Sequence, residues 1–223
     1  MNDQKLSRRI KIHSIVFCVF FLIGWVAYSN SLRSGFMLDD HAFFDEKMQN
    51  IKFLPYQFLP DKDKALNIKG GKTDSYYRPI AHVIPMLSYL VFKDNTFGHH
   101  WVNLILFLFA VYCIYFLIYS LSQDFILSFI AALLYLIHPI NGVFVNYITA
   151  NVYAAQVILM SLSLICLLQS FKARRENLFY VLSLSFFTIS LLCHETSMAI
   201  KPTISQSARI AAIPGAFRMV PKS

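Results

Sequence analysis

The chain has 223 residues, of which 57% are hydrophobic and only 14% are charged, and its formal net charge is +8. A soluble domain is about 45–50% apolar and about 25% charged, so this composition excludes an ordinary soluble domain and predicts a membrane protein. Because the basic residues flank apolar runs, the positive charge indicates membrane topology and we expect no nucleic-acid partner.

A first transmembrane helix is predicted over residues 12–31, after a cytoplasmic N-terminus of residues 1–11. Four basic residues lie in that N-terminus: Lys5, Arg8, Arg9 and Lys11. The apolar run is long for a cleaved signal peptide and lacks a clear small-residue cleavage site. A retained signal anchor is therefore favoured over a cleaved leader.

A large outer loop is predicted over residues 32–98, and it begins with two adjacent acids, Asp39 and Asp40. Carboxylates near a bilayer are costly to desolvate, so the pair suggests a site that takes a proton or holds a cation. The alternative is a solvated loop or a helix N-cap. Within the loop, a helix of about residues 79–92 is too short to span the membrane, and we expect it to lie in the outer interface.

Four further transmembrane helices are predicted from apolar runs, and an irregular tail follows them. The predicted spans are 100–119, 125–140, 152–171 and 178–194, and the tail is 195–223. The predicted fold class is thus an all-α polytopic membrane protein with about five transmembrane helices and a large first outer loop. Lys172, Arg174 and Arg175 between the last two spans should be cytoplasmic, as should the N-terminus.

With this topology, the polar residues that are candidates for a site are predicted to lie on the outer side of the membrane. They are Asp39, Asp40, Tyr77, Arg78, His100, Asn103, His138, His194 and Glu195. His100 and Asn103 are one helical turn apart and share a face. Simpler roles remain open: Arg78 could bind bilayer phosphates, His138 could cap a helix end, and Glu195 could pair with Lys201.

The order of these residues resembles that of a known family. The Asp-Asp pair is followed by Tyr77-Arg78-Pro79, by His100-Trp101-Val102-Asn103 at the start of the second span, and by His138-Pro139-Ile140 at the end of the third. This order is similar to that of C-type glycosyltransferases that use polyprenyl-phosphate sugars, in particular the transmembrane-and-TPR protein O-mannosyltransferases and their bacterial relatives. In that family's pattern a Lys-Glu pair stands where this chain has His194-Glu195.

The resemblance implies an activity and a partial fold. A sugar, a hexose such as mannose, would move from a polyprenyl phosphate to a hydroxyl acceptor on a protein or glycan at the outer face. Asp39 or Asp40 would be the general base and Arg78 would stabilise the phosphate, while Tyr77 and the His, Asn and Glu candidates would bind the donor phosphate or substrate. The family fold continues with more spans, so the chain is expected to be a truncated, N-terminal part.

No cofactor is expected, although Asp39 and Asp40 could hold a divalent cation. The expected partners are the lipid bilayer, the polyprenyl-phosphate sugar and the hydroxyl acceptor, and a second subunit could supply further helices. The phenylalanine-rich spans and the absence of a visible C-terminal retention signal favour a bacterial inner membrane with a periplasmic active face, with the endoplasmic reticulum as the alternative.

Two other classes of function stay open. A non-catalytic membrane assembly protein or truncated gene product is suggested by the irregular tail, which Pro214, Gly215 and Pro221 interrupt. A transporter fragment for lipid-linked sugars would need polar residues in mid-span, and apart from Gln156 and scattered Ser and Thr the spans are apolar.

Overall fold

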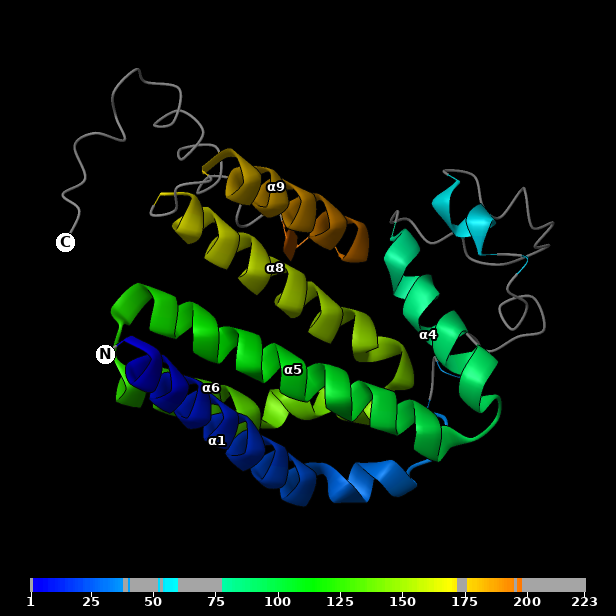
Figure 1. The fold of residues 1–223 in the computed structure, drawn as a ribbon. Coiled ribbons are helices and arrows are strands. Elements are labelled where there is room, and N and C mark those ends of the chain that lie inside the picture. The colour runs from blue at the N-terminus through cyan, green and yellow to red at the C-terminus, as the bar shows by residue number, and fades with distance from the viewer. Residues whose placement is uncertain are drawn as a thin grey trace.

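The computed structural model shows a bundle of helices and, in the part of the chain that it describes, no β-strand (Figure 1). The described residues are 2–37, 40, 52, 54–59, 78–171, 176–194 and 196–197. Four helices are long and apolar enough to cross a membrane: Ile10–Arg33, Thr96–Ser122, Ile148–Ser170 and Glu176–Cys193. A bent pair, Phe125–Ile137 with Pro139–Asn146, would make a fifth span. The prediction of an all-α polytopic membrane protein is confirmed.

Helix α5 (Thr96–Ser122) lies at the centre of the bundle. It contacts α1 (Asn2–Tyr28) and α6 (Phe125–Ile137) on one side and α8 (Asn151–Ser170) on the other. Helix α9 (Glu176–Cys193) packs along the far side of α8, so the helices form a row from α1 and α6 to α9 (Figure 1). The central position of α5 explains why its Leu104 and Phe107 have no exposed surface.

The contact of α1 with α5 and α6 is close and largely aromatic. Phe20 is buried and stacks on Phe129 of α6 with ring centroids 5.2 Å apart. The Tyr28 hydroxyl donates to the Leu136 carbonyl oxygen at 2.7 Å, in the last turn of α6. Gly24 allows the close approach, because a Cβ atom there would lie 2.4 Å from Leu108 Cδ2. Packing of this kind, with small residues at the contact, is how membrane helices associate.

Helix α8 is held to α9 by polar contacts as well as by packing. The Ser163 hydroxyl donates to the Ser183 carbonyl oxygen at 2.9 Å. Near the start of α8, Gln156 Nε2 donates to the His194 carbonyl oxygen and to the hydroxyls of Thr196 and Ser197. The polar span residue that could have indicated transport therefore joins α8 to the residues after α9.

Helix α4 (Pro79–Phe92) crosses the bundle at one end, beside α5, α8 and α9 (Figure 1). The contact between α4 and α5 includes His99 of α5, which is fully buried. The His99 Nδ1 is 2.6 Å from the Ser88 hydroxyl of α4, and the His99 Nε2 is 2.7 Å from the Lys93 carbonyl oxygen. Because a carbonyl oxygen only accepts, Nε2 carries the proton and Nδ1 of the neutral ring accepts from Ser88. His99 thus fixes α4 to the start of α5.

The third predicted span ends earlier than expected and bends. Helix α6 ends at Ile137, not at residue 140, and the helical turns over Pro139–Asn146 lie at 60° to it. His138 between them is extended, with φ −65° and ψ 126°. The cause is Pro139, because a proline ring disfavours helical geometry in the preceding residue.

Other helix bounds differ from the predictions by a few residues. Helix α5 is longer than the predicted 100–119, while α8 and α9 begin one or two residues before 152 and 178. Helix α1 continues from Tyr28 as the short η1 (Ser29–Arg33). Residues 38–39, 41–51, 53 and 60–77 of the outer loop and most of the tail 195–223 lie outside the described residues; a short helix, η3 (Pro55–Phe58), is described within the loop.

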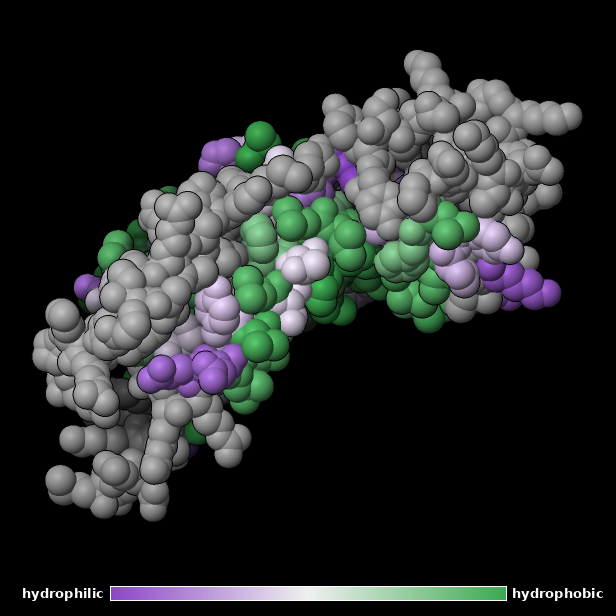
Figure 2. All heavy atoms as spheres, turned by 90° about the horizontal axis from the view of Figure 1, so that it is seen from above, coloured by the Kyte–Doolittle hydropathy of each residue, from purple (hydrophilic) through white to green (hydrophobic). Residues whose placement is uncertain are grey.

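The described surface suits a lipid environment. Large hydrophobic side chains are exposed on α1, α5, α6 and α9, for example Val26, Ile105, Leu134 and Val181. Figure 2 shows hydrophobic residues over the middle of the face seen from above, with hydrophilic residues toward its ends. In a membrane these exposed side chains would contact lipid and not water, so their exposure would not destabilise the protein.

We expect Gly98→Ala to destabilise the protein. A Cβ atom at Gly98 would lie 2.1 Å from Cδ1 of the Phe92 ring, so α4 and α5 would have to separate. Overpacking costs about 1–3 kcal/mol, more than the gain of up to about 1 kcal/mol from replacing glycine in a helix. The measurement is thermal unfolding in detergent. Gly35→Ala is the matched control, because no atom lies within 4 Å of a Cβ there. Equal melting temperatures for the two variants would contradict the close contact of α4 with α5.

Candidate functional site

The site is built around the irregular chain that joins α6 to α8, residues 138–150, called here the connecting segment. It consists of η4 (Pro139–Gly142), α7 (Val143–Asn146) and η5 (Ile148–Ala150). Val145 and Ile148 are fully buried in it. Buried backbone that is not in a regular helix must find hydrogen-bond partners elsewhere, and side chains from other elements provide them.

Asp40 is the first of these side chains and is fully buried. Its Oδ1 accepts from the Thr149 backbone N–H at 3.0 Å, and its Oδ2 accepts from that of Ile148 at 3.4 Å. Oδ2 also accepts from the Met37 N–H at 3.1 Å. One carboxylate therefore joins the chain after α1 to the end of the connecting segment, more than 100 residues later.

His100 and Asn103 supply the second set of contacts, from neighbouring turns of α5. His100 Nδ1 is 2.9 Å from the Val145 carbonyl oxygen. Asn103 Nδ2 donates to the carbonyl oxygens of Tyr147 at 2.6 Å and Ile148 at 3.3 Å. Both side chains are fully buried, so the predicted shared face of α5 points at the connecting segment.

Asn151, the first residue of α8, completes the group. Its side chain is also fully buried. We call Asp40, His100, Asn103 and Asn151 the buried polar cluster. Sequence reasoning missed Asn151 as a site residue; the available signal was a polar residue directly before the predicted span 152–171.

The other predicted site residues are placed apart from this cluster or are not described. His138 is exposed, and its Nδ1 accepts from the Ile140 N–H at 3.3 Å, a capping role. The half-buried His194 lies beside the Tyr153 ring at a centroid distance of 5.2 Å and bonds with Thr196. Arg78 is half-buried and immediately precedes α4. Asp39, Tyr77 and Glu195 lie outside the described residues.

The hydrogen bonds place Asp40, His100 and Asn103 at one end of the bundle, where the His194 backbone also lies. Asp40, the start of α5 and the start of α8 meet at the connecting segment. Gln156 of α8 reaches the His194 carbonyl oxygen at the end of α9. In Figure 1 the start of α5, the start of α8, the end of α9 and α4 all lie on the right. That all the predicted site residues gather at one membrane face stays a prediction, because Asp39, Tyr77 and Glu195 lie outside the described residues.

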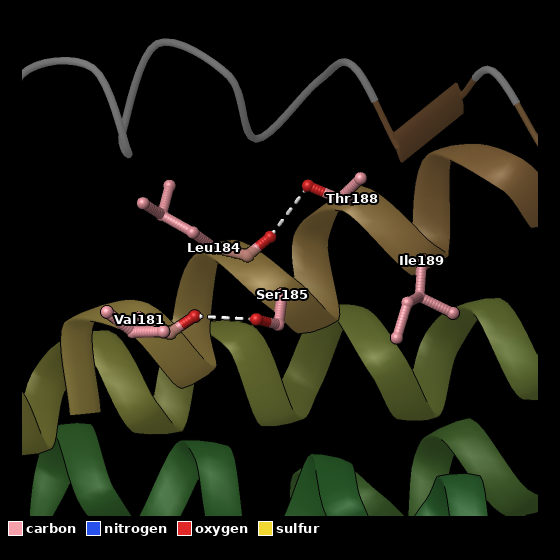
Figure 3. A pocket seen from close by; sticks show the side chains of 5 residues that line it. All are labelled: Val181, Leu184, Ser185, Thr188 and Ile189. Atoms are coloured by element: carbon pink, nitrogen blue, oxygen red, sulfur yellow. Dashed lines mark hydrogen bonds between the residues drawn. The ribbon is translucent and has the colours of Figure 1, made fainter. Parts of the chain in front are cut away.

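Among the described residues, no group of three or more His, Cys, Asp or Glu could hold a metal ion. A shallow depression of about 370 Å³ lies on α9, lined by Val181, Leu184, Ser185, Thr188 and Ile189 (Figure 3). Its two hydroxyls, of Ser185 and Thr188, donate to carbonyl oxygens of α9 itself at 2.9 Å, so the depression offers a ligand little polar binding.

Comparison with known proteins gives one match. Over 176 residues the chain is 27% identical to a protein O-mannosyl-transferase of Caenorhabditis elegans, and the match covers 77% of this chain and 25% of that protein. The chain has a distant O-mannosyl-transferase homologue. It spans about a quarter of that relative's length. No family model matches the chain, and no solved structure matches it.

We expect Asp40→Asn to loosen the connecting segment. An amide in place of the carboxylate keeps one acceptor oxygen and sets an N–H group against a backbone N–H, and a hydrogen bond to a charged acceptor is worth about 1.5–3 kcal/mol. Hydrogen–deuterium exchange of the Ile148 and Thr149 amides should then become faster.

Asp124→Asn is the matched control for this prediction. Asp124 caps α6 at the opposite end of the bundle, where its Oδ1 accepts from the N–H groups of Ile126 and Leu127. Its replacement should speed exchange at those amides and leave Ile148 and Thr149 unchanged. Unchanged exchange at Ile148 and Thr149 in Asp40→Asn would show that Asp40 does not hold the segment.

Proposed function

We propose that this chain is part of a membrane glycosyltransferase that moves a hexose, such as mannose, from a polyprenyl phosphate to a hydroxyl acceptor. The observation that carries the proposal is the buried polar cluster, which collects a carboxylate, an imidazole and two amides at one end of an apolar bundle. Polar side chains at such a place are costly, and in membrane proteins they mark functional sites by default. The distant O-mannosyl-transferase homologue supports the same chemistry.

The proposed reaction needs few groups from the protein. The acceptor oxygen attacks the anomeric carbon of the sugar as the bond from that carbon to the phosphate oxygen breaks, and polyprenyl phosphate leaves. A carboxylate takes the proton of the acceptor hydroxyl as general base. Arg78, next to α4, is the candidate to stabilise charge on the leaving phosphate, because a guanidinium binds phosphate through two parallel hydrogen bonds.

The contacts of Asp40 favour Asp39 as the general base. Both oxygens of Asp40 already accept backbone N–H groups, and the residue is fully buried. A base must reach the proton that it removes, within about 2.6–3.2 Å or through one water. We therefore assign Asp40 to positioning of the connecting segment and Asp39 to proton removal.

The membrane face of the proposed site follows from charge. The lysine and arginines between α8 and α9 in the sequence, at 172, 174 and 175, favour a cytoplasmic position for that connection. The buried polar cluster lies at the opposite end of α8. We therefore place the proposed transfer on the non-cytoplasmic side, where a lipid-linked donor can enter from the outer leaflet.

We expect Asp39→Asn to abolish transfer while the protein stays folded. General-base catalysis contributes about 10²–10⁴-fold, so the rate should fall by at least about 10²-fold. The assay follows labelled mannose from polyprenyl-phosphate mannose to a serine- and threonine-rich peptide in membranes that hold the full chain. Thermal unfolding should show the same melting temperature as the wild type.

Asp94→Asn is the matched control, because Asp94 is an acid in the turn after α4 whose side chain, among the described residues, accepts a hydrogen bond from the Tyr89 hydroxyl. Its transfer rate should equal that of the wild type. Wild-type membranes that bind the donor but transfer no mannose would favour the non-catalytic assembly protein instead. Equal transfer by Asp39→Asn and wild type would rule out Asp39 as the base.

A further inference from the structure

Within the part of the chain that the structure describes, three members of the buried polar cluster carry polar atoms that have no hydrogen-bond partner. They are His100 Nε2, Asn103 Oδ1 and both Nδ2 and Oδ1 of Asn151. All three side chains have no exposed surface. In folded proteins such atoms are rare, and each needs an explanation such as a bound water or a ligand. His100 and Asn103 bind backbone between Val145 and Ile148, and Asn151 begins α8 three residues further along the chain.

The remaining contacts decide what these atoms can bind. His100 Nδ1 faces the Val145 carbonyl oxygen and so carries a proton; in the tautomer with a single ring proton, Nε2 is then an acceptor. Asn103 directs its amide nitrogen at two carbonyl oxygens, which leaves Oδ1 as an acceptor. Asn151 offers one further acceptor and one amide donor group. The unpartnered atoms are thus mainly acceptors.

Acceptors of this kind suit hydroxyl groups and not a phosphate. A hydroxyl can donate to a ring nitrogen or an amide oxygen and can also accept from an amide, whereas the ionised phosphate diester of the donor has only acceptor oxygens. The two acceptors next to the Val145 and Tyr147 carbonyl oxygens would repel such an anion. A neutral polyol such as a sugar ring carries several hydroxyls that fit.

We propose that His100, Asn103 and Asn151 bind the hydroxyl groups of the transferred sugar, while the lipid phosphate binds outside this group. This assignment rests on the proposed glycosyltransferase function and adds Asn151 to it. Because the three side chains have no exposed surface, sugar binding requires the packing around them to open.

The test compares binding of three probes to the full-length chain and to Asn151→Leu in detergent. The probes are mannosyl polyprenyl phosphate, the same polyprenyl phosphate without sugar, and methyl α-mannoside. The wild type should prefer the mannosylated lipid by about tenfold or more, the effect of one or two hydrogen bonds. Asn151→Leu should lose this preference and keep its affinity for the sugar-free lipid.

Asn141→Leu is the matched control at the same end of the bundle. Asn141 is also buried, but its Nδ2 donates to the Tyr135 carbonyl oxygen at 2.6 Å. Asn141→Leu should melt at a lower temperature than the wild type and keep the preference for mannose. Asn151→Leu should melt at the same or a higher temperature without ligand, because it removes polar atoms that have no partner.

The outcomes separate this proposal from the wider function. If neither lipid binds but methyl α-mannoside raises the melting temperature of the wild type and not of Asn151→Leu, the sugar site stands and the glycosyltransferase proposal fails. Equal weakening of both lipids in Asn151→Leu would assign the cluster to the phosphate and overturn the proposal. A lower melting temperature of Asn151→Leu, with no probe distinguishing it from the wild type, would show that internal waters satisfy these atoms, which also overturns it.

Discussion

The structure depends on how the buried backbone between α6 and α8 finds hydrogen-bond partners. The connecting segment leaves regular helix at His138 and resumes it at Asn151, so several of its N–H and C=O groups have no helical partner. Asp40 binds two of its N–H groups, and His100 and Asn103 bind three of its carbonyl oxygens. Irregular backbone is tolerated in a membrane bundle only when protein groups satisfy it in this way. These side chains therefore hold α1, α5 and α8 at fixed relative positions.

The same contacts separate structural from chemical roles among the polar residues. A polar atom that already has its partner, such as those of Asp40 and His99, serves to position the chain. The unpartnered atoms of His100, Asn103 and Asn151 remain available for a ligand. The proposed function uses both kinds: one set builds a rigid end to the bundle, and the other gives that end its chemistry. Rigid support of this kind is what a binding site needs to keep its geometry.

Much of the architecture could be predicted from local patterns. Long apolar runs gave the spans, because about 20 apolar residues are needed to cross a bilayer. Pro79 marked the start of α4 at the observed residue, since proline suits the first turn of a helix. The bend after α6 was missed, although Pro139 signalled it, because the apolar run continues through Ile140 and hides the break. The side of α5 that bears His100 and Asn103 followed from their spacing.

The partners of each polar residue could not be predicted in this way. The sequence by itself determined that the chain is helical, that it belongs in a membrane and that its polar candidates lie near helix ends. Composition and the length of apolar runs can be read from short stretches of sequence, which is why these features could be predicted. Only the tertiary structure decided that Asp40 binds residues 148 and 149, that His99 joins α4 to α5 while His100 turns to Val145, and that Asn151 belongs with them. Those pairings join residues up to 109 positions apart. Such contacts depend on how whole helices pack, which no short stretch of sequence encodes.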